Sequence, residues 1–387
     1  MEHLINPRVQ GIQISGIRQF FTMVANYPDA ISLTIGQPDF MTPEHIKEAG
    51  KRAIEENKTI YTPNAGILAL REAAAQFMQE RYGLRYDPEH EIITTVGASQ
   101  AIDITLRTIL EEGSEVILPG PVYPGYEPII KLCGAVPVYV DTRDTGFKMR
   151  ADRIKEKISD RTRCIILPYP SNPTGCILDR QSVEEIAELV REKEIFIVSD
   201  EIYSELVYGE SGEKHLSIAS FSDLREKTIV INGLSKSHAM TGWRVGFTFA
   251  PRYLTQHMLK VHQYNVSCAS SVSQYASLEA LQNGALDAEP MRDAYRSRRD
   301  YVYERLVQMG MDIVKPEGAF YLFPSIQKYG LSSWEFAKRL LEQERVAVVP
   351  GDAFSHYGEG YVRLSYAYSM DVLEEGCNRL EKFITSL

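Results

Sequence analysis

The sequence has few cysteines, no long apolar run and no excess of basic residues, and each feature excludes a class of protein. Its five cysteines are odd in number, widely spaced and never in a Cys-x-x-Cys pair, which argues against a disulfide framework and a zinc knuckle. No apolar run approaches the roughly 18 residues of a membrane span. The 52 acidic residues outnumber the 42 basic ones, and a net charge of −10 disfavours nucleic-acid binding.

The sequence also shows no metal-binding pattern and no targeting segment. Its eight histidines are scattered, and His257 and His262 do not share a helix face. The first residues do not form a basic stretch followed by an apolar one, so we expect no signal peptide. We therefore expect a cytoplasmic protein that has no metal and that binds neither a membrane nor a nucleic acid.

The 387 residues are enough for two to three domains of roughly 150 residues each. From about residue 90 to 250, short runs rich in Val, Ile and Thr alternate with amphipathic segments, which predicts an α/β layer with a largely parallel sheet. Ser182 and Glu185 predict a capping box at the start of one of the helices between the runs. The predicted strands are residues 91–96, 115–118, 136–141, 163–168, 195–200, 228–232 and 245–250.

The pattern changes after about residue 285. Pro290 predicts the start of a long charged helix that ends before Gly310. Short strands and two further helices follow, at residues 333–344 and from Asp371 onward. We expect a large domain over residues 31–285 and a small α+β domain over residues 286–387, which the N-terminal segment 1–30 joins.

The most informative stretch, residues 232–246, reads Asn-Gly-Leu-Ser-Lys-Ser-His-Ala-Met-Thr-Gly-Trp-Arg-Val-Gly. Lys236 follows an apolar strand, and a lysine shielded from water there can lose its proton and become a nucleophile. Ser235 and Arg244 add a hydroxyl and a permanent positive charge, which suit a phosphate. From composition alone, a surface loop with a solvated lysine is the more ordinary interpretation.

This stretch resembles the lysine signature of the class I/II aminotransferases, which are pyridoxal-5′-phosphate (PLP) enzymes of the aspartate aminotransferase fold. Further landmarks in that family's order extend the resemblance over nearly the whole chain. The resemblance implies an α/β fold with a PLP-transferase-like large domain, a mostly parallel seven-stranded sheet and a smaller α+β domain. It also implies that Lys236 forms a Schiff base with PLP and that Ser235 and Arg244 bind the cofactor phosphate.

The ring of the cofactor needs a carboxylate partner to keep its nitrogen protonated. Asp200 ends the apolar run 195–200, and α/β sheets place ligands at the carboxyl ends of their strands. From the residues alone, an aspartate that caps the next turn is an equal alternative. The resemblance implies that Asp200 faces the pyridine nitrogen and that Tyr203 bonds the phenolic oxygen of the cofactor.

Two proline-containing turns supply further candidates for the cofactor site. Asn172 lies in Tyr-Pro-Ser-Asn-Pro-Thr-Gly, and the resemblance implies that it shares the phenolic oxygen with Tyr203, which lowers the pKa of the Schiff base. In the loop Pro-Gly-Pro-Val-Tyr-Pro-Gly-Tyr, the resemblance implies an aromatic ring stacked on the pyridine, and the family pattern favours Tyr123 over Tyr126. Without the resemblance, both segments are ordinary turns.

Two more segments match the family's phosphate contacts. Gly-Ala-Ser-Gln at residues 97–100 places backbone N–H groups at a helix N-terminus, and the resemblance gives Ala98 and Ser99 the phosphate cradle. Tyr61, in Tyr-Thr-Pro-Asn-Ala-Gly, matches a tyrosine that reaches the phosphate of the neighbouring subunit. The resemblance therefore implies a homodimer, whereas a surface turn before the next helix would not require one.

The substrate is expected to be an amino acid, whose α-carboxylate needs a cationic partner. Arg363 alternates with apolar residues in the run 361–365, and an arginine on a half-buried strand favours a bidentate carboxylate. The resemblance implies this role for Arg363, places the Gly36 backbone beside the substrate and adds Asn172 as a second carboxylate contact. The resemblance places Arg18 in a segment that closes over the site, which makes it a candidate to bind a distal carboxylate of the substrate, and an ordinary surface arginine is the alternative.

We therefore expect a transaminase that moves an amino group between an L-amino acid and a 2-oxo acid by a ping-pong mechanism. The whole-chain pattern is similar to the branch of aspartate, aromatic and N-acetyl-diaminopimelate aminotransferases, with 2-oxoglutarate as an acceptor candidate. One alternative is another PLP enzyme of fold type I, namely a C–S β-lyase, a racemase or a cyclising synthase. A remote alternative is a non-catalytic module of a transcription regulator.

Overall fold

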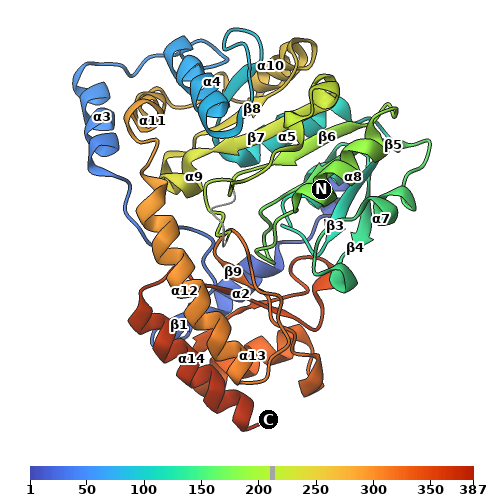
Figure 1. The fold of residues 1–387 in the computed structure, drawn as a ribbon, viewed down its shortest axis with the longest axis vertical. Helices are drawn as coiled ribbons and strands as arrows, with labels where there is room; N and C mark the ends of the chain where they lie inside the picture. Colours follow the sequence, from blue (N-terminus) through green and yellow to red (C-terminus); the bar gives the residue numbers. More distant parts are fainter. Residues whose placement is uncertain (210–213) are drawn as a thin grey trace.

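The computed structural model describes residues 1–209 and 214–387 and is organised around a seven-stranded sheet (Figure 1). The strand order is β2-β8-β7-β6-β5-β3-β4. Only β8 runs against its neighbours in this sheet, which confirms the predicted, mostly parallel seven-stranded arrangement. The strands are β2 (Ile92–Thr95), β3 (Glu115–Gly120), β4 (Val136–Asp141), β5 (Thr162–Leu167), β6 (Phe196–Asp200), β7 (Thr228–Gly233) and β8 (Gly246–Phe249).

Helices lie before, between and after the strands of this sheet along the described chain. Those of the first 285 residues are α1 (Pro7–Gln10), α2 (Gly16–Val24), α3 (Glu44–Glu55), α4 (Leu68–Tyr82), α5 (Gly97–Ile109), α6 (Tyr126–Leu132), α7 (Ala151–Lys155), α8 (Arg180–Val190), α9 (Leu234–Ser237), α10 (Arg252–Val266) and α11 (Ser271–Asn283). The later ones are α12 (Ala288–Gln308), α13 (Ser333–Glu344) and α14 (Met370–Thr385). No helix in the described ranges is both long and apolar enough to cross a membrane.

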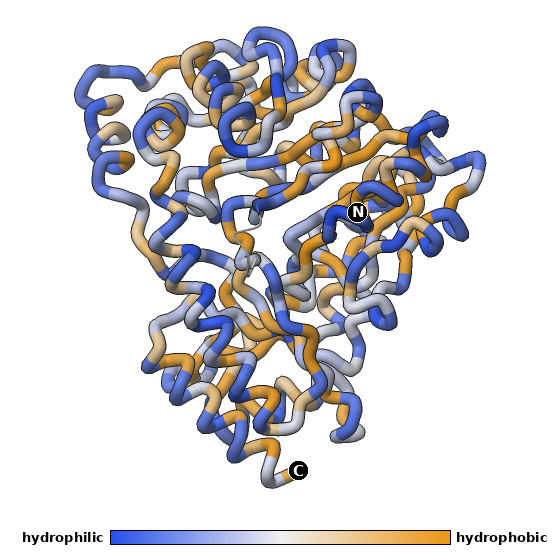
Figure 2. The backbone as a smooth tube through the Cα atoms, in the orientation of Figure 1, coloured by the Kyte–Doolittle hydropathy of each residue, from blue (hydrophilic) through white to orange (hydrophobic). Residues whose placement is uncertain are grey.

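The central strands are apolar on both faces because helices cover both faces. On β6, Ile197 packs into the cluster of α7 and α8, whereas its neighbour Val198 packs into the cluster of α5 and α10. On β7, Val230 packs with α4 and α11. Figure 2 shows the resulting hydrophobic segments along the strands and hydrophilic segments on the outer helices.

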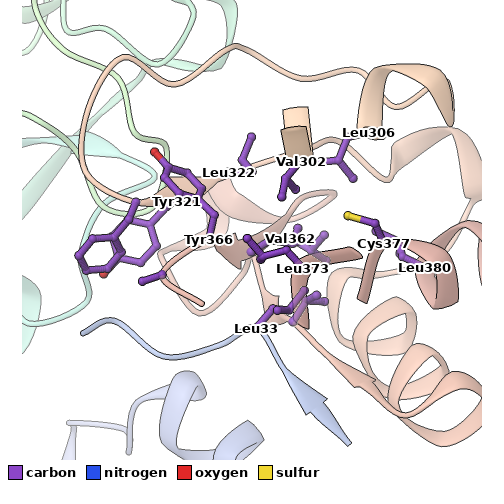
Figure 3. Close-up of a cluster of buried hydrophobic side chains, with 14 of the residues drawn as sticks. Leu33, Val302, Leu306, Tyr321, Leu322, Val362, Tyr366, Leu373, Cys377 and Leu380 are labelled. Atoms are coloured by element: carbon purple, nitrogen blue, oxygen red, sulfur yellow. The ribbon is translucent and has the colours of Figure 1, made fainter. Parts of the chain in front are cut away.

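The C-terminal elements pack around a separate core, part of which is drawn in Figure 3. A parallel pair joins β1 (Ile31–Ser32) to β10 (Val346–Ala347), and a three-stranded sheet joins β11 (Val349–Pro350), β12 (Val362–Ser365) and β9 (Tyr321–Leu322). From the N-terminal segment, Phe20 of α2 is fully buried in this core and meets Trp334 edge to face. The domain limits at residues 30 and 285 stay a prediction.

Two predicted helix starts were wrong by a few residues. Helix α8 begins at Arg180, and its N-cap is Asp179, whose carboxylate accepts a hydrogen bond from the Ser182 backbone N–H at 2.8 Å. Aspartate and serine both suit an N-cap, and the aspartate comes first. Helix α12 begins at Ala288 rather than at Pro290, because a proline is tolerated throughout the first turn, where no intrahelical donor is needed.

We expect Asp179→Ala to lower the free energy of unfolding by about 1 kcal/mol, the usual value of an N-cap side chain. Ser182→Ala is the comparison: the Ser182 hydroxyl contacts the Asp179 carboxylate but is not the N-cap, so its removal should cost less than removal of the cap itself. Urea unfolding followed by circular dichroism measures both. A larger loss for Ser182→Ala than for Asp179→Ala would contradict the observed helix start.

Candidate active site

A cavity of about 540 Å³ lies where the parallel strands of the large sheet end, which is the edge at which α/β sheets bind ligands. Loops after β2, β3, β5 and β7 line it, together with the last residue of β6. The C-terminal core adds residues from β9 and β12. The cavity brings together eleven of the twelve predicted site residues: Gly36, Ala98, Ser99, Tyr123, Asn172, Asp200, Tyr203, Ser235, Lys236, Arg244 and Arg363.

Lys236 lies in α9, the short helix that directly follows β7, and lines this cavity. Its Nζ donates a hydrogen bond to the backbone carbonyl of Gly36 at 2.6 Å. Loss of hydration, and then the positive charges of Arg363 and Arg244, lower the pKa of this amine to about 8, while Asp200 opposes them. A fraction of Lys236 is therefore already a neutral, nucleophilic amine just above neutral pH, and about half is neutral at pH 8.

Asp200 is buried at the end of β6 and is held by two donors. The Tyr126 hydroxyl donates to Oδ2 at 2.6 Å, and the Ile202 backbone N–H donates to Oδ1 at 3.3 Å. Burial raises the pKa of Asp200 to about 6, although the Tyr126 hydrogen bond opposes that shift. Most of the carboxylate is ionised at pH 7, and a cation placed against it would lower the pKa further. This environment fits a protonated ring nitrogen.

The first turn of α5 and the start of β8 together form a concave surface, which we call the cradle, in which Gly97 and Gly246 leave no room for a side chain. A Cβ on Gly97, whose φ is +75°, would lie 2.5 Å from Nη2 of Arg244. A Cβ on Gly246 would lie 2.5 Å from the Ala98 backbone nitrogen. Glycine at both positions brings the N–H groups of a helix N-terminus close to the guanidinium of Arg244, so the cradle fits a phosphate.

Arg363 presents a second anion site inside the cavity. Its side chain is 2% exposed, and it donates to Asn172 Oδ1 at 2.9 Å and to the Thr34 carbonyl at 2.6 Å. The guanidinium lies 4.4 Å from the ring centre of Tyr321, and its Nε has no hydrogen-bond partner within the described residues. A buried guanidinium with an unused donor and no carboxylate partner there fits a substrate carboxylate.

Sequence reasoning missed two tyrosines that support these groups. Tyr126, whose only weighed role was that of the stacking ring, instead donates its hydroxyl hydrogen bond to Asp200. The Tyr321 hydroxyl lies 2.7 Å from that of Tyr203, and its ring lies under Arg363. Tyr321 therefore links the predicted cofactor contact to the predicted carboxylate contact. No local motif marks either role, because both partners lie far away in the sequence.

The twelfth predicted residue, Tyr61, does not reach the cavity of its own subunit. It lies between α3 and α4 and is 86% exposed. This position does not test a contact across a dimer interface, so the role of Tyr61 stays a prediction. The cofactor and substrate contacts of the eleven cavity residues stay predictions as well.

Comparisons with known proteins point in one direction. The family model described as aminotransferase class I and II matches residues 28–380. The chain is 60% identical, over 99% of its length and 96% of the relative, to a protein of Bacillus subtilis (strain 168) named probable N-acetyl-LL-diaminopimelate aminotransferase. It is 42% identical to the aspartate aminotransferase of Pyrococcus abyssi, over 98% of both chains. The structure of Thermus thermophilus aspartate aminotransferase with maleate superposes with a TM-score of 0.93 at 37% identity, covering 98% of this chain and 99% of that one.

The lowered pKa of Lys236 predicts an unusual pH dependence of its reactivity. In protein freed of bound small molecules, we expect the rate of acylation of Lys236 by acetic anhydride to rise through a midpoint near pH 8, because only the neutral amine reacts. The exposed Lys51, whose pKa is raised by Glu48, should react only at much higher pH. Peptide mass spectrometry measures both rates in one sample.

The charges around Lys236 supply the control. Arg363→Gln removes a positive charge that lowers the pKa of Lys236, so its midpoint should move to higher pH while that of Lys51 stays in place. Equal midpoints for the two lysines in the unaltered protein would contradict the described environment.

Proposed function

This chain belongs to the class I and II aminotransferases, and from that membership we propose that PLP is its cofactor and that it works by a ping-pong mechanism. Its activity is amino-group transfer between an amino acid and a 2-oxo acid. The observation that carries the proposal is the Lys236 amine, with a pKa of about 8, between the cradle at Arg244 and the buried Arg363. That arrangement provides one nucleophile and two anion sites in one cavity.

The residues that would hold PLP form three groups. The first turn of α5 at Ala98 and Ser99, with Ser235 and Arg244, would bind the phosphate. Asp200 would bond the ring nitrogen and keep it protonated. The remaining contacts would be Tyr123 on the ring face and Asn172 and Tyr203 at the phenolic oxygen. Bound PLP would supply an aldehyde for amine exchange and a ring that delocalises the electron pair left on Cα.

The protein's own work is to orient the substrate and move its proton. Arg363 and Asn172 would fix the α-carboxylate, which places the Cα–H bond toward Lys236. The Nζ of Lys236 would accept that proton, because a base with a pKa of about 8 is near its optimum at neutral pH. Gly36 leaves the approach open, since a Cβ there would lie 2.8 Å from the Tyr321 hydroxyl oxygen.

We propose N-acetyl-LL-diaminopimelate as the amino donor and 2-oxoglutarate as the acceptor. The support is the 60% identity, over almost the full length of both chains, to the Bacillus subtilis protein named for that donor. Other dicarboxylic or aromatic amino acids are the alternatives, because relatives named for aspartate and aromatic amino acids are 42% identical. We also propose a homodimer in which Tyr61 of each subunit reaches the phosphate in the other.

The absorption spectrum of the purified protein tests the cofactor and the reaction together. We expect a near-visible band that Lys236→Ala abolishes, because the lysine amine holds the cofactor. The correct donor should convert this band to that of the amine form of the cofactor, and a 2-oxo acid should restore it. Product release without the amine form would instead indicate a β-lyase or racemase, and no band after addition of PLP would refute the proposal.

We expect Tyr126→Phe to weaken PLP binding by about 10-fold or more, the value of a hydrogen bond to a charged group. Loss of this bond raises the pKa of Asp200 above about 6, so the defect should grow as the pH falls from 8 to 6. Titration of cofactor-free protein with PLP measures the dissociation constant at each pH. Tyr253→Phe, which removes an exposed hydroxyl bonded to the Glu226 carbonyl, is the control. A pH-independent defect would contradict a role through Asp200.

A further inference from the structure

A second cavity, of about 680 Å³, adjoins the active-site cavity. The two cavities share Ile17 and Tyr123 in their linings, so they meet between the start of α2 and the loop before α6. Ile17 and Phe21, one helical turn apart on α2, face the active-site cavity, whereas Arg18 faces the second one. The start of α2 is therefore the partition between the two cavities, and we call the second one the outer chamber.

The start of α2, which separates the two cavities, is held in place by packing against the C-terminal core and against the loop of Asp352. Phe20 of α2 is fully buried in the C-terminal core against Trp334. A Cβ on Gly16 would lie 3.0 Å from Cβ of Ala353, so the start of α2 is in close contact with the loop that carries Asp352. Arg18 and Asp352 thus reach the outer chamber from two elements that touch each other.

The charged groups of the outer chamber are only partly neutralised. Glu127 and Lys131, one turn apart on α6, form an ion pair, and the Tyr139 hydroxyl donates to Glu127 at 2.5 Å. Arg18 forms no ion pair and no side-chain hydrogen bond with any residue that the structure describes. Asp352, whose carboxylate accepts from the Ala353 backbone N–H, forms no ion pair with those residues either. The wall therefore offers one free cation and one free anion to a ligand.

A ligand group that complements both Arg18 and Asp352 carries a carboxylate beside an N–H donor. A carboxylate alone would satisfy Arg18 but would meet the charge of Asp352, and an apolar group would satisfy neither. Arg18 can hold a carboxylate with two parallel hydrogen bonds, and Asp352 can accept from an adjacent ammonium or amide N–H. Such an end is a second amino-acid head group, with its nitrogen free or acylated.

Resting on the aminotransferase function proposed above, we propose that the outer chamber receives the far end of a long amino donor. Arg18 binds its distal carboxylate, and Asp352 accepts a hydrogen bond from the nitrogen beside that carboxylate. The α-carboxylate remains at Arg363, and the chain of the substrate passes between Ile17 and Tyr123. These residues select for length and for the pair of distal groups, not for the reaction.

The test compares donors on the PLP-loaded enzyme, with kcat/KM measured for the first half-reaction. The donors are 2-aminobutyrate, 2-aminopimelate, LL-diaminopimelate and N-acetyl-LL-diaminopimelate. We expect Arg18→Gln to lower kcat/KM about 10- to 100-fold more for the three long donors than for 2-aminobutyrate, the range for a charge-assisted hydrogen bond. Arg18→Lys should recover part of the loss. Arg8→Gln, which removes an exposed arginine bonded to Glu112, is the matched control and should change no donor.

Asp352→Asn separates the two forms of the distal nitrogen. It should lower kcat/KM for LL-diaminopimelate more than for the N-acetyl donor, because only the free ammonium loses an ion pair, whereas an amide N–H can still donate to the asparagine oxygen. The same variant should improve 2-aminopimelate, since the neighbouring negative charge is removed. An equal loss for all donors in Asp352→Asn would refute the role of this residue.

Binding without turnover gives an independent readout. Calorimetric titration of the PLP-loaded enzyme with pimelate, which carries two carboxylates and no amine, should show weaker binding in Arg18→Gln than in the unaltered enzyme. Unchanged pimelate binding, or an equal loss of kcat/KM for short and long donors, would overturn the inference while transamination stands. Failure of the unaltered enzyme to accept any donor would instead refute the proposed function.

Discussion

The active site depends on one electrostatic arrangement, in which a half-buried amine feels the positive charges of two guanidinium groups. Lys236 comes from α9, which follows β7 of the large sheet, whereas Arg363 comes from β12 and the carbonyl that accepts from Lys236 belongs to Gly36. Distant parts of the chain must therefore meet before the pKa of the amine falls to about 8. Neither a folded sheet alone nor the C-terminal elements alone would produce this nucleophile.

The negative charge of Asp200 opposes the effect of the two arginines on the pKa of Lys236. Its carboxylate is buried, and two donors keep it oriented. Burial of a carboxylate and of an amine shifts their pKa values toward each other, to about 6 and about 8. Both groups can then change protonation at small cost near neutral pH, which is the condition that acid–base chemistry requires.

Much of the fold could be predicted from the sequence, because buried parallel strands read as continuous Val and Ile runs that end in polar residues. That pattern located β6 and β7, and with them Asp200 and Lys236 at the sheet edge. Family resemblance was needed to assign roles to Asn172 and Arg363, since a turn asparagine and a strand arginine have many uses. Tyr126 and Tyr321 could not be found, because their partners are set by tertiary packing. The predicted capping box at Ser182 was wrong because Asp179 and Ser182 both suit an N-cap, and the helix starts after the first of them.

The antiparallel direction of β8 has a consequence for the size of the ligand. Gly233, at the end of β7, is paired with Gly246, at the start of β8, so the segment between them is closed at its base. Lys236 and Arg244 both lie in that closed segment. The spacing between the Lys236 amine and the Arg244 guanidinium is therefore set by this one short segment, whose two ends are held together by the pairing of β7 with β8. A change in the length of this segment would alter the size of the molecule that the two groups can hold at once.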